Sequence, residues 1–208
     1  MRIRRLEAEW GGGKVNVDLR GESGNPLPIV GIVGGNGSGK SLLQKVGLRL
    51  FVTALDSRRC FLDWDDVSGY MECEYGGAIS SGVVKKGKII QNMVFPQSTM
   101  SAGILDNGCL FYSSSSLLSG NHVGAVLADL YKGKVSNSVL WVDSFDFGLD
   151  DSSAREFLKV LVKKSLERDN QLIVSTARRE LLSGIGEDAV RQLSSGTNVV
   201  EKLLKTLR

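Results

Sequence analysis

A glycine-rich segment at positions 34 to 42 carries the clearest chemical motif of the chain. They read Gly-Gly-Asn-Gly-Ser-Gly-Lys-Ser-Leu, and the first eight satisfy the pattern GxxxxGK[ST] in full. In this pattern the glycines let backbone N–H groups converge on phosphate oxygens, the lysine reaches the β and γ phosphates, and the serine hydroxyl ligates Mg²⁺. We therefore predict binding of a nucleoside triphosphate with Mg²⁺ by Gly34, Gly35, Asn36, Gly37, Ser38, Gly39, Lys40, Ser41 and Leu42. The alternative is a glycine-rich turn without a ligand.

The metal in such a site needs an acidic ligand as well, and one follows an apolar run later in the chain. Val139 to Val142 read as a buried strand, and Asp143 ends it. Mg²⁺ prefers oxygen ligands and is held by one or two carboxylates beside the phosphates. Asp143 is the predicted acidic ligand, although many buried strands end in Asp for structural reasons alone.

The segment around Asp143 resembles the ATP-binding cassette (ABC) ATPases. Residues 144–150, Ser-Phe-Asp-Phe-Gly-Leu-Asp, are similar to the segment that links the metal-binding Asp of that family to its dimer-contacting loop, and Gly148, Leu149 and Asp150 match that loop. Leu-Ser-Gly-Asn-His at 118–122 looks like a degenerate LSGGQ signature, 25 residues before Asp143 (143 − 118). The resemblance implies that Ser119, Gly120 and Asn121 close over ATP held by another subunit, in an ATP-sandwiched homodimer or heteromer.

Gln97 matches the glutamine with which the same family senses Mg²⁺ and the attacking water. The resemblance therefore implies that Gln97 belongs to the metal site together with Ser41 and Asp143. A surface glutamine is the alternative. Only 21 residues (118 − 97) separate it from the signature. That is too few for the helical subdomain of transporter ATPases or for a coiled-coil arm. Met1–Trp10 and Gln171–Thr176 are similar to strands of the RecF-like, SMC-like and phage-defence-associated ATPases, which are associated with DNA.

Two positions depart from the family pattern. Ser144 stands where the family has its catalytic Glu, and a serine hydroxyl is no base at neutral pH. Ala177 stands where the family has its switch His. Hydrolysis is therefore expected to be slow or absent, and no catalytic residue is assigned.

Several substitutes for the missing groups stay open. Asp146 or Asp150 could orient water, a partner subunit could supply a base, and His122 could act across a dimer, although it also fits an ordinary helix start. Arg178 and Arg179 could meet a γ-phosphate, a nucleic-acid backbone or water.

Alternating and apolar runs indicate the elements that hold these residues. We expect an α/β P-loop NTPase fold of the ABC type, with a mostly parallel core sheet flanked by helices, an N-terminal antiparallel β subdomain and a reduced helical subdomain. The expected strands and strand pairs are a hairpin over 2–20, and strands at 27–33, 60–64, 70–75, 88–95, 138–142 and 171–175. The expected helices span 41–55, 117–130 and 152–167, with a short one near 180, and the serine-rich 112–116 predicts a loop. Ser153 and Glu156 have the spacing of a capping box for the long helix.

Length and composition suit one domain over 1–208. Within it, 1–33 and 59–96 are assigned to the antiparallel β subdomain and 98–130 to the signature-bearing helical region. The chain is 42% hydrophobic and carries a net charge of +3, which by itself does not indicate nucleic acid. Its three cysteines show no CxxC spacing, and no stretch is long and apolar enough for a membrane span. We expect a cytoplasmic protein without direct membrane insertion.

The leading functional hypothesis is an ATP·Mg²⁺-binding ABC-type ATPase of the DNA-associated type, acting as a nucleotide-dependent dimer switch or clamp. The alternative is a non-hydrolysing subunit whose bound ATP stabilises a multiprotein complex; a transporter's nucleotide-binding subunit fits less well. ATP is preferred to GTP by the resemblance, and no NKxD motif is present. The sequence leaves open the pathway, the partner proteins and contact with DNA.

Overall fold

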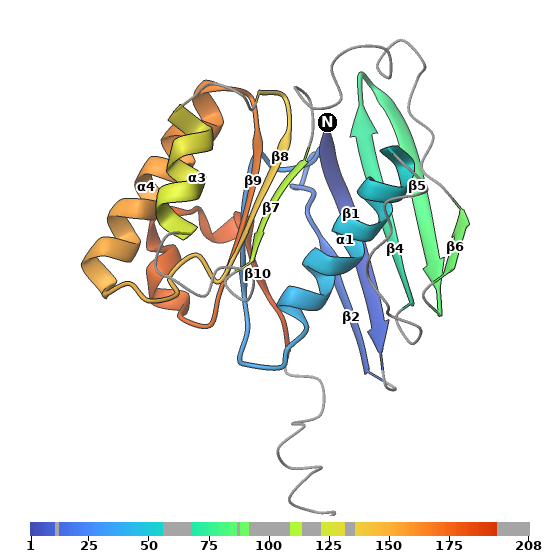
Figure 1. Ribbon diagram of the computed structural model, residues 1–208, viewed down its shortest axis with the longest axis horizontal. Helices are drawn as coiled ribbons and strands as arrows, with labels where there is room; N and C mark the ends of the chain where they lie inside the picture. Colours follow the sequence, from blue (N-terminus) through green and yellow to red (C-terminus); the bar gives the residue numbers. More distant parts are fainter. Residues whose placement is uncertain are drawn as a thin grey trace, which may run out of the picture.

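Two five-stranded sheets with a helix between them form the body of the molecule in the computed structural model (Figure 1). The structure describes residues 1–10, 13–55, 68–86, 88–91, 109–113, 122–131 and 136–194. The predicted strand at 60–64, the end of the one at 88–95, and most of the 98–130 helical region lie outside these residues.

The first sheet is antiparallel and runs in the order β2-β1-β4-β5-β6. Its strands are β1 (Arg2–Trp10), β2 (Gly13–Asp18), β4 (Ser68–Tyr75), β5 (Ala78–Lys85) and β6 (Lys88–Gln91). The predicted hairpin is confirmed, since β1 pairs with β2 from Arg5 opposite Asp18 to Trp10 opposite Gly13. A register shift between Ile3 and Arg5 in the pairing with β4 keeps Ile3 and Leu6 both buried.

The second sheet is parallel throughout and runs in the order β10-β3-β9-β8-β7. Its strands are β3 (Ile29–Val33), β7 (Cys109–Ser113), β8 (Val139–Asp143), β9 (Gln171–Thr176) and β10 (Val190–Gln192). Ile29–Val33, which the sequence assigned with 1–33 to the β subdomain, therefore pairs in this sheet. Tyr112 and Ser113 belong to β7 rather than to the expected loop.

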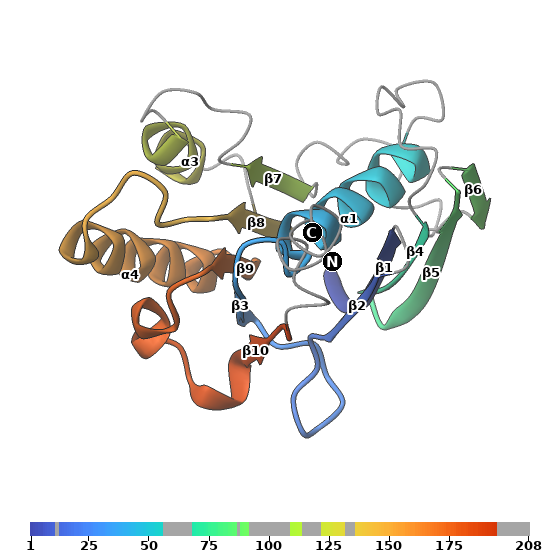
Figure 2. The same ribbon diagram turned by 90° about the horizontal axis from the view of Figure 1, so that it is seen from below.

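Burial on both faces explains the apolar runs of the parallel sheet. Alternate residues of β8 and β9 point to opposite sides: Val139, Trp141 and Ile173 pack with α1, while Leu140 and Val174 join the core on the other face. Helix α1 (Lys40–Leu55) thus lies between the two sheets, as Figures 1 and 2 show, and its Leu43, Val46 and Leu50 are buried there. The outer face of the parallel sheet is covered by α3 (His122–Tyr131) and α4 (Asp151–Glu167).

The start of α4 differs from the predicted capping box. Asp150 is the N-cap, and its carboxylate accepts hydrogen bonds from both the backbone N–H (2.9 Å) and the hydroxyl (2.8 Å) of Ser153. Glu156 instead forms an ion pair with Lys159 at 2.6 Å. Asp and Ser are equally good caps, and the aspartate that comes first in the chain takes the role. Leu166, in the last turn of α4, is 53% exposed.

One buried side chain ties the two sheets together. Gln171, at the start of β9, accepts a hydrogen bond from Ile3 N (2.6 Å) and donates to Ile3 O (2.8 Å) and Leu27 O (3.0 Å). Every polar atom of this amide that could bond is thus used within the protein. Gln171 fixes β1 against the amino end of the parallel sheet.

After β9 the chain forms two short 3₁₀ helices, η2 (Arg179–Gly184) and η3 (Glu187–Ala189), before it adds β10 to the sheet. The helix expected near Glu180 is thus a 3₁₀ helix. Among the described residues, none of the helices has both the length and the apolar character needed to cross a bilayer.

Candidate nucleotide site

The loop from Gly34 to Gly39 joins the carboxyl end of β3 to the first turn of α1, as the sequence predicts. Gly37 and Gly39 have φ values of 78° and 95°, a region that favours glycine. A Cβ at Gly39 would also lie 2.9 Å from atoms of both Trp10 and Val15. The loop is pinned to the sheet, because Gly34 N donates to Thr176 O at 3.3 Å. Glycine is therefore required at position 39 by backbone angle and by packing.

Lys40 begins α1, and its side chain turns back into the loop. Its Nζ donates to Gly34 O at 2.5 Å and to Gly35 O at 3.0 Å, and the residue is only 7% exposed. Burial lowers the pKa of this ammonium, opposed by the charges of Asp143 and Asp146. A buried ammonium group that two backbone carbonyls hold at a helix N-terminus is placed to bind anionic oxygens.

Ser41 and Asp143 meet at the carboxyl ends of the parallel strands. Ser41 Oγ donates to Asp143 Oδ2 at 2.5 Å, and Ser175 Oγ contacts the other carboxylate oxygen. Asp143 is 2% exposed. A serine hydroxyl beside a carboxylate is a set of hard oxygen donors of the kind that Mg²⁺ accepts together with phosphate and water. The residues present thus fit the ion that the loop implies.

Ser144 begins the turn after β8 and lines the same cavity as the loop. Its φ is 49°, in the left-handed region, and its backbone N–H donates to Ser175 Oγ at 3.0 Å. The cavity has a volume of about 290 Å³ and is lined by Trp10, Asn36, Gly37, Ser38, Gly39, Lys40, Ser41, Leu42 and Ser144. Position 144, where the family has its catalytic Glu, therefore borders the cavity beside the phosphate loop.

Trp10 is a residue of this site that sequence reasoning assigned only to the first strand. It ends β1, on the antiparallel sheet, and its indole closes the cavity beside Gly39. An aromatic residue at the end of an alternating strand is the only sequence signal, and it does not say which loop the ring will meet.

The residues after Asp143 form a closed turn. Phe147 N donates to Ser144 O at 2.9 Å, and Leu149 N donates to Asp146 O at 3.1 Å. Gly148 has a φ of 73°, and Asp150 caps α4. The expected dimer-loop residues Gly148, Leu149 and Asp150 thus lie on one surface turn between β8 and α4.

The arginines after β9 have acidic partners rather than free guanidinium groups. Arg178 forms ion pairs with Asp146 (2.7 Å) and Asp151 (2.5 Å), and Arg179 pairs with Glu187 (2.7 Å). Asp146, considered above as a substitute for the missing base, is therefore held by Arg178. Ala177, between β9 and these arginines, is exposed.

The other predicted site residues lie outside the described residues. These are Gln97, Ser119, Gly120 and Asn121; His122, the first residue of α3, is described only as part of that helix. Their assignment stays a prediction.

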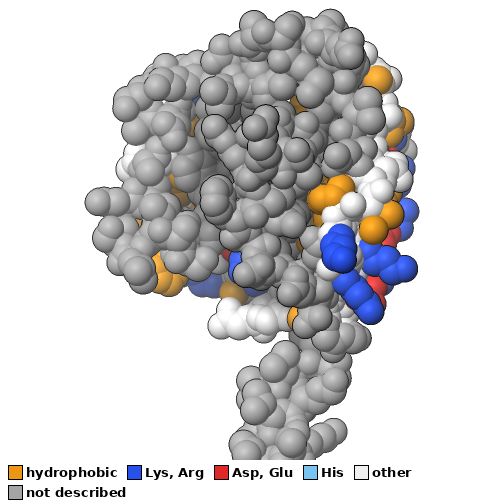
Figure 3. Space-filling view, turned by 45° about the vertical axis from the view of Figure 1, so that its right-hand side comes forward, with side chains coloured by type: hydrophobic (Ala, Val, Ile, Leu, Met, Phe, Trp, Pro, Cys, Tyr) orange, Lys and Arg blue, Asp and Glu red, His pale blue; other side chains and the backbone are white. Residues whose placement is uncertain are grey.

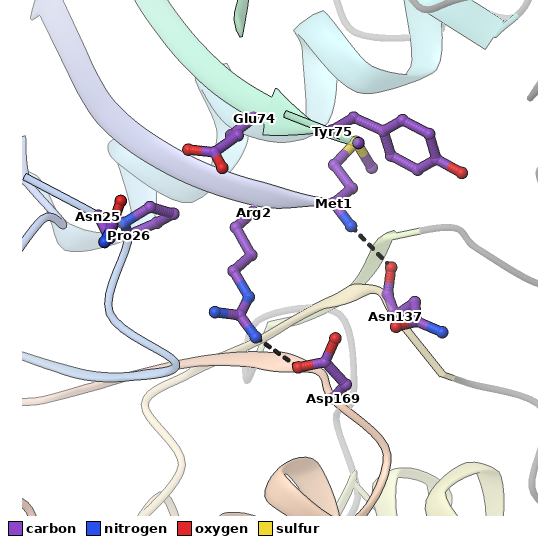
Figure 4. A pocket seen from close by; sticks show the side chains of 9 residues that line it. Met1, Arg2, Asn25, Pro26, Glu74, Tyr75, Asn137 and Asp169 are labelled. Carbon is purple, nitrogen blue, oxygen red and sulfur yellow. Dashed lines mark hydrogen bonds and ion pairs between the residues drawn. The ribbon is translucent and has the colours of Figure 1, made fainter. Parts of the chain in front are cut away.

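A larger cavity of about 590 Å³ lies at the other end of the parallel strands (Figure 4). It is crossed by an ion pair between Arg2 and Asp169 and by a hydrogen bond from the Met1 amino group to Asn137 O at 2.9 Å. Ligands of parallel α/β sheets bind outside the carboxyl ends of the strands. That rule and the phosphate loop place the candidate site at the smaller cavity.

Comparison with known proteins gives the fold. The chain is similar to the structure "SmcHead bound to the C-winged helix domain of ScpA", with 11% identity, 92% of this chain and 94% of that chain covered, and a TM-score of 0.53. This likeness shows the fold, which is an α/β P-loop NTPase fold. The fold class predicted from the sequence is thereby confirmed.

Two further solved structures are similar with TM-scores below 0.5. The SMC head domain from Thermotoga maritima is 18% identical over 92% of this chain and 94% of its own, with a TM-score of 0.48. The cbiO1 protein of Clostridium perfringens, part of the ABC transporter complex cbiONQ, is 15% identical over 94% of this chain and 86% of its own, with a TM-score of 0.41. No protein-family model and no curated protein matches the chain.

Proposed function

We propose that the chain binds ATP with Mg²⁺ between the 34–42 loop and Asp143, and that the nucleotide-bound form assembles into a dimer that works as a switch or clamp. The observation that carries the proposal is the meeting of Ser41 Oγ and Asp143 Oδ2 at 2.5 Å beside the buried Lys40 ammonium. Phosphates would take over the Lys40 donors that now reach Gly34 O and Gly35 O. Mg²⁺ would take the oxygens of Ser41 and Asp143, with Gln97 as the third residue that the family resemblance offers.

Trp10 completes this binding proposal. Its indole forms the wall of the cavity next to the loop, and a planar aromatic face is a platform on which a nucleobase can stack. Stacking on Trp10 is our proposal for how the base is held, and it does not distinguish adenine from guanine. The choice of ATP rests on the family resemblance.

Slow or absent hydrolysis follows from the side chains at two positions. Ser144, which lines the cavity, has only a hydroxyl where the family has a carboxylate, and Ala177 has no polar group. Asp146, the nearest alternative carboxylate in the turn, is in an ion pair with Arg178. Bound ATP would then act by stabilising one assembly state, since a ligand that binds only one state shifts the equilibrium toward it.

Nucleotide titration tests the binding proposal. Calorimetry with ATP·Mg²⁺ should show one site per chain in the wild-type protein. Lys40→Ala should abolish the signal, and Lys45→Ala, an exposed lysine on the same helix, should leave it intact. Equal binding by Lys40→Ala and the wild type would reject the site.

Phosphate release tests the assignment of position 144. We expect no release above the Lys40→Ala background in the wild type and a clear gain in Ser144→Glu, with Ser144→Ala as the control for loss of the hydroxyl. Light scattering with and without ATP·Mg²⁺ tests the dimer. A monomer at high protein concentration in both conditions, for the Ser144→Glu variant as well, would reject the homodimer.

The second candidate function is a non-hydrolysing assembly subunit, and the presence of Ser144 at the cavity, in place of the family's Glu, favours it. The similar SmcHead structure holds the C-winged helix domain of ScpA, which gives a precedent for a protein partner on this fold. In this second function, the ATP-bound chain assembles with a different protein instead of with a second copy of itself. ATP-dependent co-purification of one stoichiometric partner, lost in Lys40→Ala, would support it over the homodimer.

Contact with DNA is a further part of the proposal. Lys85, Lys86 and Lys88 are exposed at the β5–β6 hairpin, and among the described residues no acidic side chain forms an ion pair with them. Figure 3 shows basic side chains on this side of the molecule, with acidic side chains among them. Phosphate contacts by such lysines would give salt-dependent binding. Loss of DNA binding in a triple Lys→Ala variant of the hairpin, with ATP binding intact, is the expected result.

A further inference from the structure

Arg178 reaches the turn between β8 and α4 at four points. Its Nε donates to Asp146 Oδ2 at 2.7 Å, and its Nη1 donates to Asp151 Oδ1 at 2.5 Å. Its Nη2 donates to two backbone carbonyls, Asp146 O at 3.3 Å and Leu149 O at 3.4 Å. One guanidinium thus joins the beginning, the middle and the end of the 146–151 segment.

That segment has few backbone hydrogen bonds of its own. Those given above, from Phe147 N and Leu149 N, close two small turns, and the residues at Ser144 and Gly148 have positive φ. Phe147, between them, is 58% exposed. Contacts from outside the turn also hold it: Leu149 packs against the buried core, Asp150 caps α4, and Arg178 supplies four hydrogen bonds.

Other hydrogen bonds connect the turn with the phosphate loop. Arg178 N donates to Thr176 Oγ1 at 3.0 Å, and Thr176 O accepts the hydrogen bond from Gly34 N. At the other end of the turn, Ser144 N is bonded to Ser175 Oγ, which contacts Asp143. The end of β9 is therefore bonded to the loop that would hold phosphate, and the arginine that contacts the turn follows it in the chain.

We propose that Arg178 is a positioning residue that holds the 146–151 turn in one conformation and so pre-organises it to contact a second copy of the chain. The part that concerns the second copy rests on the function proposed above, and the part that concerns the turn does not. Arginine is required because its planar fork presents donors from three nitrogens at once, whereas a lysine ammonium on a flexible stem reaches one carboxylate.

The test compares Arg178→Lys and Arg178→Ala with Arg179→Ala. Arg179 is the matched control, since it is the next residue and its ion pair goes to Glu187 on η3. Hydrogen exchange of the peptide that covers 144–151 is measured without nucleotide, followed by ATP·Mg²⁺ affinity and the dissociation constant of the ATP-dependent dimer.

We expect exchange at Phe147 and Leu149 to rise about tenfold in both Arg178 variants, the size of effect that loss of a charge-assisted hydrogen bond produces. The dimer should weaken by about tenfold for the same reason, with ATP affinity within about twofold of the wild type. Arg179→Ala should match the wild type in all three measurements. Arg178→Lys keeps the charge, so it preserves the comparison if Arg178→Ala does not fold.

Unchanged exchange in Arg178→Lys would overturn the proposal, as would an equal rise in Arg179→Ala. Parallel loss of ATP affinity and dimerisation would also overturn it, because that pattern marks a general structural defect. If the wild-type protein forms no ATP-dependent dimer, the proposed function fails in that respect, and the exchange comparison still decides whether Arg178 holds the turn.

Discussion

Ser41 Oγ donates a 2.5 Å hydrogen bond to Asp143 Oδ2, although 102 positions separate the two residues in the chain. The first belongs to the helix that follows β3 and the second ends β8, and β9 lies between those strands in the sheet. Carboxyl ends of parallel strands share one edge, so a loop after one strand and an Asp after another come together there. This pair defines the expected metal position.

Asp143→Asn should remove the Mg²⁺ dependence of ATP binding. The amide keeps the shape and one oxygen acceptor but loses the charge that attracts the ion, and changes in metal sites lower metal affinity about tenfold to a hundredfold even for outer-shell partners. Calorimetry with Mg²⁺ and with excess EDTA measures the difference. Asp188→Asn, an exposed aspartate on η3, is the control. A wild-type response to Mg²⁺ in Asp143→Asn would contradict the metal assignment.

Gly39→Ala should destabilise the fold by about 2 kcal/mol or more, because the residue has positive φ and its new methyl group meets Trp10 and Val15. Gly35→Ala is the matched change in the same loop, since a Cβ there meets nothing within 4 Å and its φ is not in the left-handed region. Urea unfolding of both variants measures the difference. Equal stabilities would show that the loop is not pressed against the antiparallel sheet.

Gln171→Leu should lower the free energy of unfolding by about 2 to 4 kcal/mol, because it leaves Ile3 N and the Ile3 and Leu27 carbonyls without their partner. Gln192→Leu, an exposed glutamine on β10, should change it by less than about 0.5 kcal/mol. The two variants are compared by urea unfolding. A loss confined to Gln192→Leu would contradict the role of Gln171.

The buried Lys40 ammonium predicts a pH dependence of stability. Burial holds the folded-state pKa of Lys40 below 10.5, the value of an ordinary lysine. At pH values between the folded-state pKa and 10.5, the unfolded chain therefore binds more protons than the folded one. Stability then rises with pH across that window. Relative to Lys40→Met, the wild-type protein should become more stable as pH increases toward 10.5. Urea midpoints for both proteins across this range are the measurement, and a trend of opposite sign would show that the ammonium is favoured by its surroundings.

The phosphate loop, Asp143 and the parallel strands could be predicted because each depends on local sequence. A buried strand on a doubly covered sheet has an apolar run, as in β3, β8 and β9, and the glycine pattern of the loop is set by the backbone angles. Cys109–Ser113 shows the limit of this reasoning. Its apolar run is short and passes into serines, so the sequence indicated a loop at 112–116, whereas Tyr112 and Ser113 belong to β7, the strand that pairs with β8 at the edge of the described sheet.

Trp10, Gln171 and Arg178 could not be assigned their contacts from the sequence, since each acts on a segment far away in the chain. The N-cap of α4 was predicted to be Ser153 and is Asp150, for another reason. Both residue types are good N-caps, and local sequence does not decide between two helix starts that lie three residues apart. The structure therefore adds partners to residues whose types were already visible.

The internal bonds of the loop have a consequence for the life of the protein before it meets any ligand. Lys40 is satisfied by Gly34 O and Gly35 O, and Ser41 by Asp143, so these two side chains of the nucleotide site already have partners. We therefore expect a newly made chain to fold without ATP. Under the proposed function, nucleotide would then enter by exchange of partners, and the population of the assembled state would follow the ATP concentration of the cell rather than the history of folding.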